Sequence, residues 1–206
     1  RFTNPESVNF FLEKNRSVIL TGMHYNNWEW GVLSFSLWLK GEIIGIYKPL
    51  SNKQVEIFLN KKRAQWGMVL CHPKDTRAAV EKYKNTASVF VLMADQSPSN
   101  AATAQWLTFL GRPTACIHGV ETIALAHGIP VWQFEVERVR RGFYEIKLAP
   151  VCPGPSVKKT TEITADFMAG IEKIISKKPE NWLWSHKRWK IPPPQNFMDS
   201  TVSGNF

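Results

Sequence analysis

The sequence contains no apolar run long enough to cross a membrane as a helix. Its longest apolar region, residues 28–39, is interrupted by Glu29 and bounded by Lys40, whereas a spanning helix needs about 18 or more such residues. No secretory signal pattern opens the chain. Because it begins with Arg1 and residues 4–15 already have a helical pattern, we expect that upstream sequence is missing and that a membrane anchor would fit there.

Cysteine is also scarce, with Cys71, Cys116 and Cys152 among 206 residues. Three cysteines cannot pair completely, which excludes a disulfide scaffold and favours a reducing compartment. The pairs Cys71-His72 and Cys116-x-His118 do not match zinc-site spacing, and each supplies too few ligands. We therefore expect no metal site.

Several catalytic signatures are missing as well. The chain has no G-x-S-x-G, which excludes the nucleophile elbow of the α/β-hydrolases. It has neither G-x-x-x-x-G-K-S/T nor G-x-G-x-x-G, so phosphate loops and dinucleotide sites lack their glycines. We expect no cofactor.

Acidic residues are few relative to basic ones. Lys and Arg number 26 against 17 Asp and Glu, which gives a net charge of +9. Such a charge favours an anionic partner, whether nucleic acid, an anionic membrane surface or an acidic carrier protein. Nucleic acid is disfavoured, because no helix-turn-helix, zinc-finger or RNP pattern is present. The nine Trp residues suit either a membrane–water boundary or a core.

Short apolar runs alternate with amphipathic segments along the chain. Strand patterns occupy residues 17–21, 43–47, 68–70 and 88–93, and helix patterns occupy residues 4–15, 27–39, 52–66, 75–84 and 116–127. This alternation predicts an α/β fold with a mostly parallel central sheet flanked by helices. Strands at 131–139 and 143–149 predict an antiparallel hairpin that makes the sheet mixed. We expect a single domain over residues 1–206.

The remaining segments complete this prediction. We expect a loop over residues 95–105, a last helix over 160–177, and a basic, Trp-containing tail that is too Pro-rich at its end to stay helical. Sites in such sheets form beyond the carboxyl ends of the strands. That rule directs attention to residues 22–30, 48–53 and 94–100.

His24 and Glu29 form an H-x-x-x-x-E pattern just after the first predicted strand. On one continuous helix these side chains would lie about 140° apart and could not meet. If His24 lies on the turn and the helix begins at Asn27, Glu29 falls in its first turn and can fold back onto the imidazole. A carboxylate there would orient a general base. The alternative is a hydrogen-bonded structural histidine.

Several sequence blocks together resemble one enzyme family. They are Gly22-Met23-His24-Tyr25-Asn26-Asn27-Trp28-Glu29-Trp30, then Tyr47-Lys48-Pro49-Leu50-x-Asn52 with Arg63 and Gly67, then Asp95-Gln96, Phe109-Leu110-Gly111-Arg112-Pro113, Gly128-Ile129-Pro130-Val131 and Pro179-Glu180-x-Trp182-x-Trp184-x-His186-x-Arg188-Trp189. In this order they resemble the lipid A biosynthesis (late) acyltransferases, which belong to the lysophospholipid acyltransferase-like superfamily with its H-x4-D/E signature. The segment from Ser97 to Gln105 departs from the family by lacking its usual glycines.

The resemblance implies a glycerolipid acyltransferase-like fold and the transfer of a fatty acyl chain from a thioester, typically acyl-carrier protein, to a hydroxyl of a membrane lipid. It implies that His24 is the general base and that Glu29 orients it, with no covalent nucleophile and no cofactor beyond the thioester. It also implies partners in the carrier protein, a lipid acceptor and the membrane surface. The expected location is the cytoplasmic face of the bacterial inner membrane, with peripheral attachment or a missing N-terminal anchor.

Five further residues are candidates for substrate binding. They are Asn52, Arg63, Asp95, Gln96 and Arg112. Arg63 would hold an oxyanion or a phosphate, or else lie on a solvated helix face. Asp95-Gln96 would position the acceptor, or else cap a turn. Asn52 is also a predicted helix cap, and Arg112 would otherwise shape its loop.

The tail from Lys177 to Lys190 interleaves tryptophans with basic residues. It predicts either a membrane-interface patch or tryptophans that pack the domain's edge. The alternatives for the whole chain are an acyltransferase for an amino-acid lipid or glycolipid, and a non-catalytic lipid-binding homologue.

Overall fold

A six-stranded sheet forms the centre of the molecule. The structure, a computed structural model, describes residues 1–154, 161–195 and 197. The sheet order is β3-β2-β4-β1-β7-β8. Its strands are β1 (Val18–Gly22), β2 (Glu42–Ile46), β3 (Val69–Cys71), β4 (Ser88–Met93), β7 (Val131–Arg140) and β8 (Phe143–Cys152). All neighbours pair in parallel except β8, which is antiparallel to β7. The predicted mixed, mostly parallel α/β sheet is therefore confirmed.

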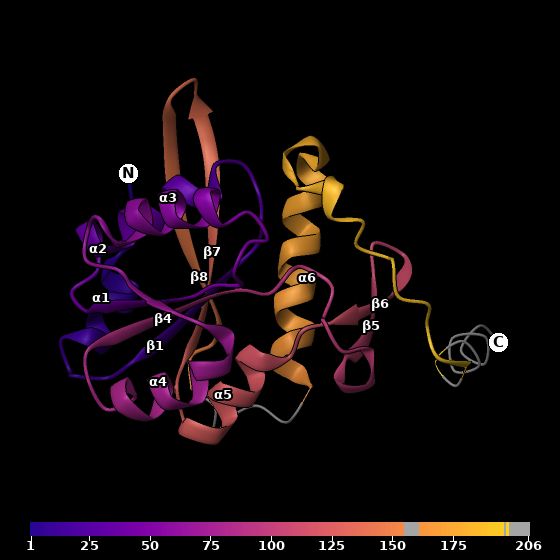
Figure 1. The fold of residues 1–206 in the computed structure, drawn as a ribbon, viewed down its shortest axis with the longest axis horizontal. Coiled ribbons are helices and arrows are strands. Elements are labelled where there is room, and N and C mark those ends of the chain that lie inside the picture. The colour runs from indigo at the N-terminus through magenta and orange to yellow at the C-terminus, as the bar shows by residue number, and fades with distance from the viewer. Residues whose placement is uncertain (155–160, 196, 198–206) are drawn as a thin grey trace.

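Helices cover both faces of this sheet (Figure 1). They are α1 (Glu6–Leu12), α2 (Trp28–Trp38), α3 (Lys53–Ala64), α4 (Thr76–Tyr83), α5 (Gly119–His127) and α6 (Glu162–Lys177), with short 3-10 turns at Pro73–Asp75, Ala101–Thr103, Pro179–Asn181 and Trp184–His186. Each predicted helix is present with slightly shifted ends. Residue 160, the predicted start of the last helix, lies outside the described residues.

The two faces of the sheet bury separate apolar clusters because side chains alternate along each strand. In β1, Ile19 joins the cluster under α4, α5 and α6, whereas Val18 and Leu20 join the cluster under α1 and α2. In β4, Phe90 and Val89 divide in the same way. The central strands are thus buried on both faces, which explains why their sequences read as continuous apolar runs.

One element differs from the prediction. Strands β5 (Gln105–Phe109) and β6 (Arg112–Cys116) form a separate antiparallel hairpin, whereas the sequence prediction ends a loop at residue 105, begins a helix at residue 116 and assigns no strand between them. The connecting Leu110 and Gly111 both have positive φ, 49° and 71°, as a two-residue hairpin turn that matches strand twist requires. Gly111 was the available signal for this turn. The hairpin lies beside α6, away from the main sheet (Figure 1).

The backbone at the end of β1 leaves no room for a side chain at Gly22. A Cβ there would lie 2.2 Å from the Phe134 ring, whereas a Cβ at Gly119 meets nothing within 4 Å. We expect Gly22→Ala to destabilise the fold by about 1–3 kcal/mol through overpacking. The matched change Gly119→Ala, at the start of α5, should be neutral or slightly stabilising. Urea unfolding checks both; equal effects would contradict the close packing at Gly22.

Candidate active site

His24 and Asp95 meet because two adjacent strands end at the same level. In the parallel pairing of β1 with β4, Gly22 lies opposite Met93. His24 and Asp95 each follow two residues later. Asp95 accepts a hydrogen bond from the His24 backbone N–H at 3.0 Å, and its second oxygen lies 2.7 Å from His24 Nδ1. The register thus brings an imidazole and a carboxylate together at the carboxyl edge of the sheet.

The Asp95 carboxylate is almost completely buried, with 1% of the residue exposed. Burial by itself would raise its pKa, but hydrogen bonding and attraction from His24, with a further hydrogen bond from the Trp182 indole N–H at 2.9 Å, hold that pKa below the ordinary 3.8. The stabilisation from ionised Asp95 is present above the ordinary pKa and is lost as pH falls through the lower folded-state pKa. At neutral pH the site therefore contains a buried anion beside His24.

This carboxylate fixes the tautomer of His24. Because ionised Asp95 can only accept hydrogen bonds, the proton of the neutral imidazole lies on Nδ1 and the lone pair lies on Nε2. The ring is held on another side by Trp28, whose ring centroid lies 4.6 Å from that of His24 at an angle of 69°. The imidazole is thus oriented to accept a proton through Nε2.

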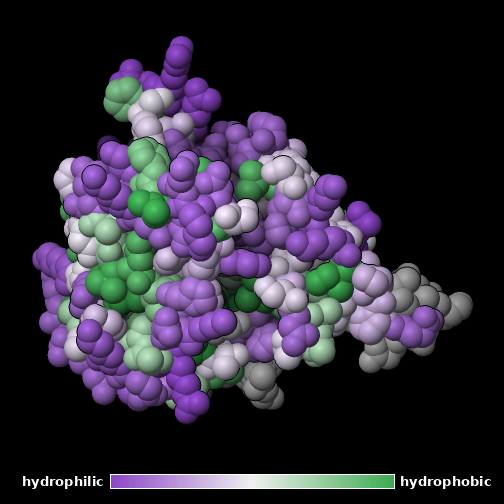
Figure 2. Space-filling model, viewed as in Figure 1, coloured by the Kyte–Doolittle hydropathy of each residue, from purple (hydrophilic) through white to green (hydrophobic). Residues whose placement is uncertain are grey.

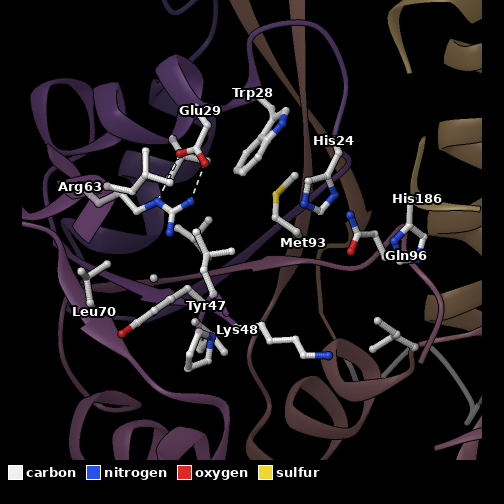
Figure 3. A pocket seen from close by; sticks show the side chains of 18 of the residues that line it. His24, Trp28, Glu29, Tyr47, Lys48, Arg63, Leu70, Met93, Gln96 and His186 are labelled. Atoms are coloured by element: carbon white, nitrogen blue, oxygen red, sulfur yellow. Dashed lines mark hydrogen bonds and ion pairs between the residues drawn. The ribbon is translucent and has the colours of Figure 1, made fainter. Parts of the chain in front are cut away.

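Glu29 does not orient His24, contrary to the sequence prediction. Both of its oxygens bind the guanidinium of Arg63, one at 3.2 Å from Nε and the other at Nη2. Trp28 lies between the Glu29 and His24 side chains in Figure 3. Glu29 is one residue beyond Trp28 on α2, so it points about 100° away around the helix and faces α3 instead.

A cavity of about 480 Å³ connects these two pairs. Its volume is typical of a small-ligand site. Its walls include His24, Glu29, Arg63, Gln96, His186 and the basic Lys48 and Lys190, together with apolar side chains of Val32, Ile46, Leu59, Met68, Leu70, Val91 and Met93. Figure 3 shows His24, Gln96 and His186 at one end and Arg63 and Leu70 at the other. The cavity can therefore accept a molecule with an apolar and a polar part.

The remaining predicted residues divide between this cavity and other sites. Gln96 lines the cavity, whereas Asp95 lies behind His24 rather than on the wall. Asn52 caps α3, because its side chain accepts hydrogen bonds from the N–H groups of residues 54 and 55. Arg112 lies over the Trp189 ring, 4.8 Å from its centroid. The structure thus places Asn52 and Arg112 outside the cavity wall.

Trp182 and His186 belong to the site but were not among the sequence candidates. Trp182 donates to Asp95, and His186 lines the cavity with its Nε2 accepting from the Ser97 backbone N–H at 3.0 Å. Burial, followed by the charge of Lys190, lowers the pKa of His186. Both residues belong to the closing sequence block, whose match to a family was the one signal that could have suggested them.

The tail that carries them packs against the domain. Trp182 is buried and Trp189 half-buried, and they form an aromatic cluster with Trp184 and Phe109. Arg188 is also buried, with Nη2 3.6 Å from the sulfur of Cys116. These contacts favour the prediction that the tail's tryptophans pack the domain's edge.

The buried cysteine beside this tail is unsuited to covalent catalysis. Burial raises the pKa of Cys116 to about 11, although Arg188 acts in the opposite direction. Its thiol is therefore protonated at neutral pH, and the thiolate is the nucleophilic form. Within the described residues, no group of three or more His, Cys, Asp and Glu side chains could hold a metal ion.

Double-mutant cycles for unfolding distinguish the pairing of Glu29 with Arg63 from the predicted pairing of Glu29 with His24. We expect Glu29→Gln and Arg63→Met to show a coupling energy of about 0.5–3 kcal/mol, because they remove one shared interaction. Glu29→Gln and His24→Ala should add within about 0.5 kcal/mol, because these residues share no partner. Urea titrations of the single and double variants measure both values. A larger coupling of Glu29 to His24 than to Arg63 would contradict the observed pairing.

Comparison with known proteins places the chain in a family. The family model described as bacterial lipid A biosynthesis acyltransferase matches residues 1–191. The chain is 26% identical over 184 residues to the lipid A biosynthesis lauroyltransferase of Escherichia coli K12, covering 87% of this chain and 58% of that protein. It is 21% identical over 199 residues to the lipid A biosynthesis acyltransferase of Haemophilus influenzae, covering 95% and 63% respectively.

The chain thus spans about three fifths of the length of these two relatives. None of the helices in the described ranges is both long and apolar enough to cross a membrane. The family match nevertheless covers both strand ends that supply His24 and Asp95, the α2–α3 ion pair and the closing tail. This chain belongs to the bacterial lipid A biosynthesis acyltransferase family.

Proposed function

We propose that this protein transfers a fatty acyl chain from an acyl thioester, with acyl-carrier protein as the carrier, to a hydroxyl of a lipid A precursor. The observation that carries the proposal is the oriented His24–Asp95 pair on the wall of a partly apolar cavity. The family match and the names of the two relatives support the substrate class. The net charge of +9 suits both an acidic carrier protein and an anionic lipid surface.

In the proposed reaction, His24 Nε2 removes the proton of the acceptor hydroxyl as its oxygen attacks the thioester carbonyl. Asp95 stabilises the imidazolium that forms, in the way that the buried carboxylate of a catalytic triad does. When the tetrahedral intermediate collapses, the carbon–sulfur bond breaks and the imidazolium returns the proton to the leaving thiolate. The sum is an ester and a free thiol, so no covalent acyl-enzyme is needed.

Arg63 is proposed to stabilise negative charge in this reaction. Its Nε and Nη2 are engaged by Glu29, so Nη1 is the edge offered to the thioester oxyanion or to a phosphate of the substrate. Glu29 would then act by holding the guanidinium in place, a positioning role different from the one predicted from the sequence. The apolar walls, including Val32, Met68 and Val91, would receive the acyl chain.

His24→Ala tests the general base. We expect product formation to fall by about 10²–10⁴-fold, because acid–base assistance by a placed histidine is worth that much. The assay is incubation with acyl-carrier-protein thioesters and a panel of lipid A precursors, amino-acid lipids and glycolipids, followed by product mass determination. His127→Gln, on α5 and outside the cavity lining, is the control and should retain activity. Activity of His24→Ala near wild type would remove His24 from the mechanism.

Asp95→Asn distinguishes orientation of His24 from contact with the acceptor. A neutral amide cannot stabilise the imidazolium, so we expect kcat to fall by at least about 100-fold while KM for the acceptor stays within about threefold. A residue that binds the acceptor would instead raise KM. Steady-state kinetics at varied acceptor concentration measures both constants, and a rise in KM with unchanged kcat would refute the orienting role.

A further inference from the structure

Helix α3 turns mostly polar residues inward and leaves its large apolar residues, apart from Leu59, exposed. The half-buried positions are Glu56, Leu59, Asn60 and Arg63, of which only Leu59 is apolar. Facing solvent are Val55, Ile57 and Phe58, which are 44%, 69% and 59% exposed. A helix packed on a globular protein ordinarily shows the reverse pattern. Exposed large apolar side chains gathered in this way mark an interaction surface.

Basic side chains frame this apolar surface. Lys53, Lys61 and Lys62 are exposed on the same helix, and the Lys62 ammonium lies 5.9 Å from the Phe58 ring centroid. The single acidic residue of α3, Glu56, is largely buried and binds Lys53 at 3.0 Å. Figure 2 shows hydrophobic side chains emerging among hydrophilic ones where α3 lies. Apolar residues bordered by lysines match a lipid surface with anionic headgroups.

The same helix forms a wall of the active-site cavity. Leu59 and Arg63 line the cavity from the inner side of α3, and Leu50, just before the helix, lines it while remaining 39% exposed. Trp66, just after the helix, is 51% exposed. The outward apolar surface and the cavity are therefore two sides of one element. A membrane held against α3 would lie next to the cavity.

We propose that the α3 face, defined as Val55, Ile57, Phe58, Lys61 and Lys62, docks on an anionic lipid bilayer. The apolar side chains enter the acyl boundary and the two lysines contact anionic headgroups. This docking rests on the proposed function, because an enzyme that acylates a membrane lipid must reach the lipid surface. It adds which face of the protein makes that contact. It holds the cavity at the surface from which a lipid acceptor is drawn.

Two other surfaces are weaker candidates. The tail's tryptophans mostly pack against one another and the domain. The β7–β8 turn exposes Val139 and Phe143 among arginines, at 59% and 54% exposure, and it extends away from the rest of the sheet (Figure 1). Because this turn supplies no residue of the cavity lining, it serves as the matched control for α3.

The test is binding to vesicles of equal parts phosphatidylcholine and phosphatidylglycerol, and to vesicles of phosphatidylcholine alone. We expect Ile57→Glu/Phe58→Glu to weaken binding to the anionic vesicles by at least about 10-fold, because it removes apolar contact and adds repulsion. Val139→Glu/Phe143→Glu makes the same change in charge at similarly exposed positions and should bind within about threefold of wild type. Circular dichroism checks that both variants fold.

One further variant measures the contribution of the lysine charges to binding, and another reports whether the α3 face is the place of contact. Lys61→Gln/Lys62→Gln should weaken binding to the anionic vesicles and leave binding to phosphatidylcholine unchanged. The blue shift of tryptophan fluorescence on vesicle addition should shrink in Trp66→Phe, because Trp66 borders the α3 face. Absence of vesicle binding by the wild type, or equal losses in the α3 and β7–β8 variants, would overturn the docking proposal.

Vesicle binding and product formation test the docking proposal and the proposed function separately. His24→Ala should bind vesicles like the wild type, since His24 lies inside the cavity. With acceptor dispersed in detergent, Ile57→Glu/Phe58→Glu should retain kcat within about threefold, while its turnover of acceptor in vesicles falls with binding. Equal loss of turnover in detergent and vesicles would overturn docking as the cause. Vesicle binding through α3 without any product would refute the acyl-transfer proposal alone.

Discussion

A buried carboxylate beside an imidazole is the interaction on which the active site depends. Removing Asp95 from water is unfavourable, and only the donors that surround it make its charge tolerable. Those donors come from His24, which follows β1, and from Trp182, in the closing tail. The Asp95 carboxylate, just after β4, is therefore hydrogen-bonded both to the segment that follows β1 and to the closing tail.

The site combines a hydrogen-bonded His24–Asp95 pair and a Glu29–Arg63 ion pair, which have different surroundings. Asp95 is enclosed and faces His24, whereas Glu29 and Arg63 lie on the cavity wall with 28% and 13% of their side chains exposed. The enclosed pair sets the tautomer of His24, and the wall pair holds the Arg63 guanidinium beside the cavity. Asp95 binds His24 through both of its carboxylate oxygens, and Glu29 binds Arg63 in the same way. Because the two carboxylates are separated, neither competes for the partner of the other.

Helix α3 lies between the cavity and the outer surface of the protein. Its inner side carries Arg63 and Leu59 to the cavity, and its outer side leaves Ile57 and Phe58 exposed. This inversion costs stability in water because apolar surface stays hydrated. In the proposed docking, that free energy is regained where the exposed face of α3 meets the lipid. The two proposals thus assign one helix both the cation at the cavity wall and the contact with the bilayer.

Local sequence determined most of the fold. Apolar runs, caps such as Asn52 and terminators such as Gly128 specified where strands and helices lie, and the strand-end rule selected the segments holding His24 and Asp95. What the sequence could not specify was which carboxylate reaches His24. That choice depends on β1 lying next to β4 in one register and on Trp28 separating His24 from Glu29. Both follow from packing between distant segments, which only the tertiary structure decides.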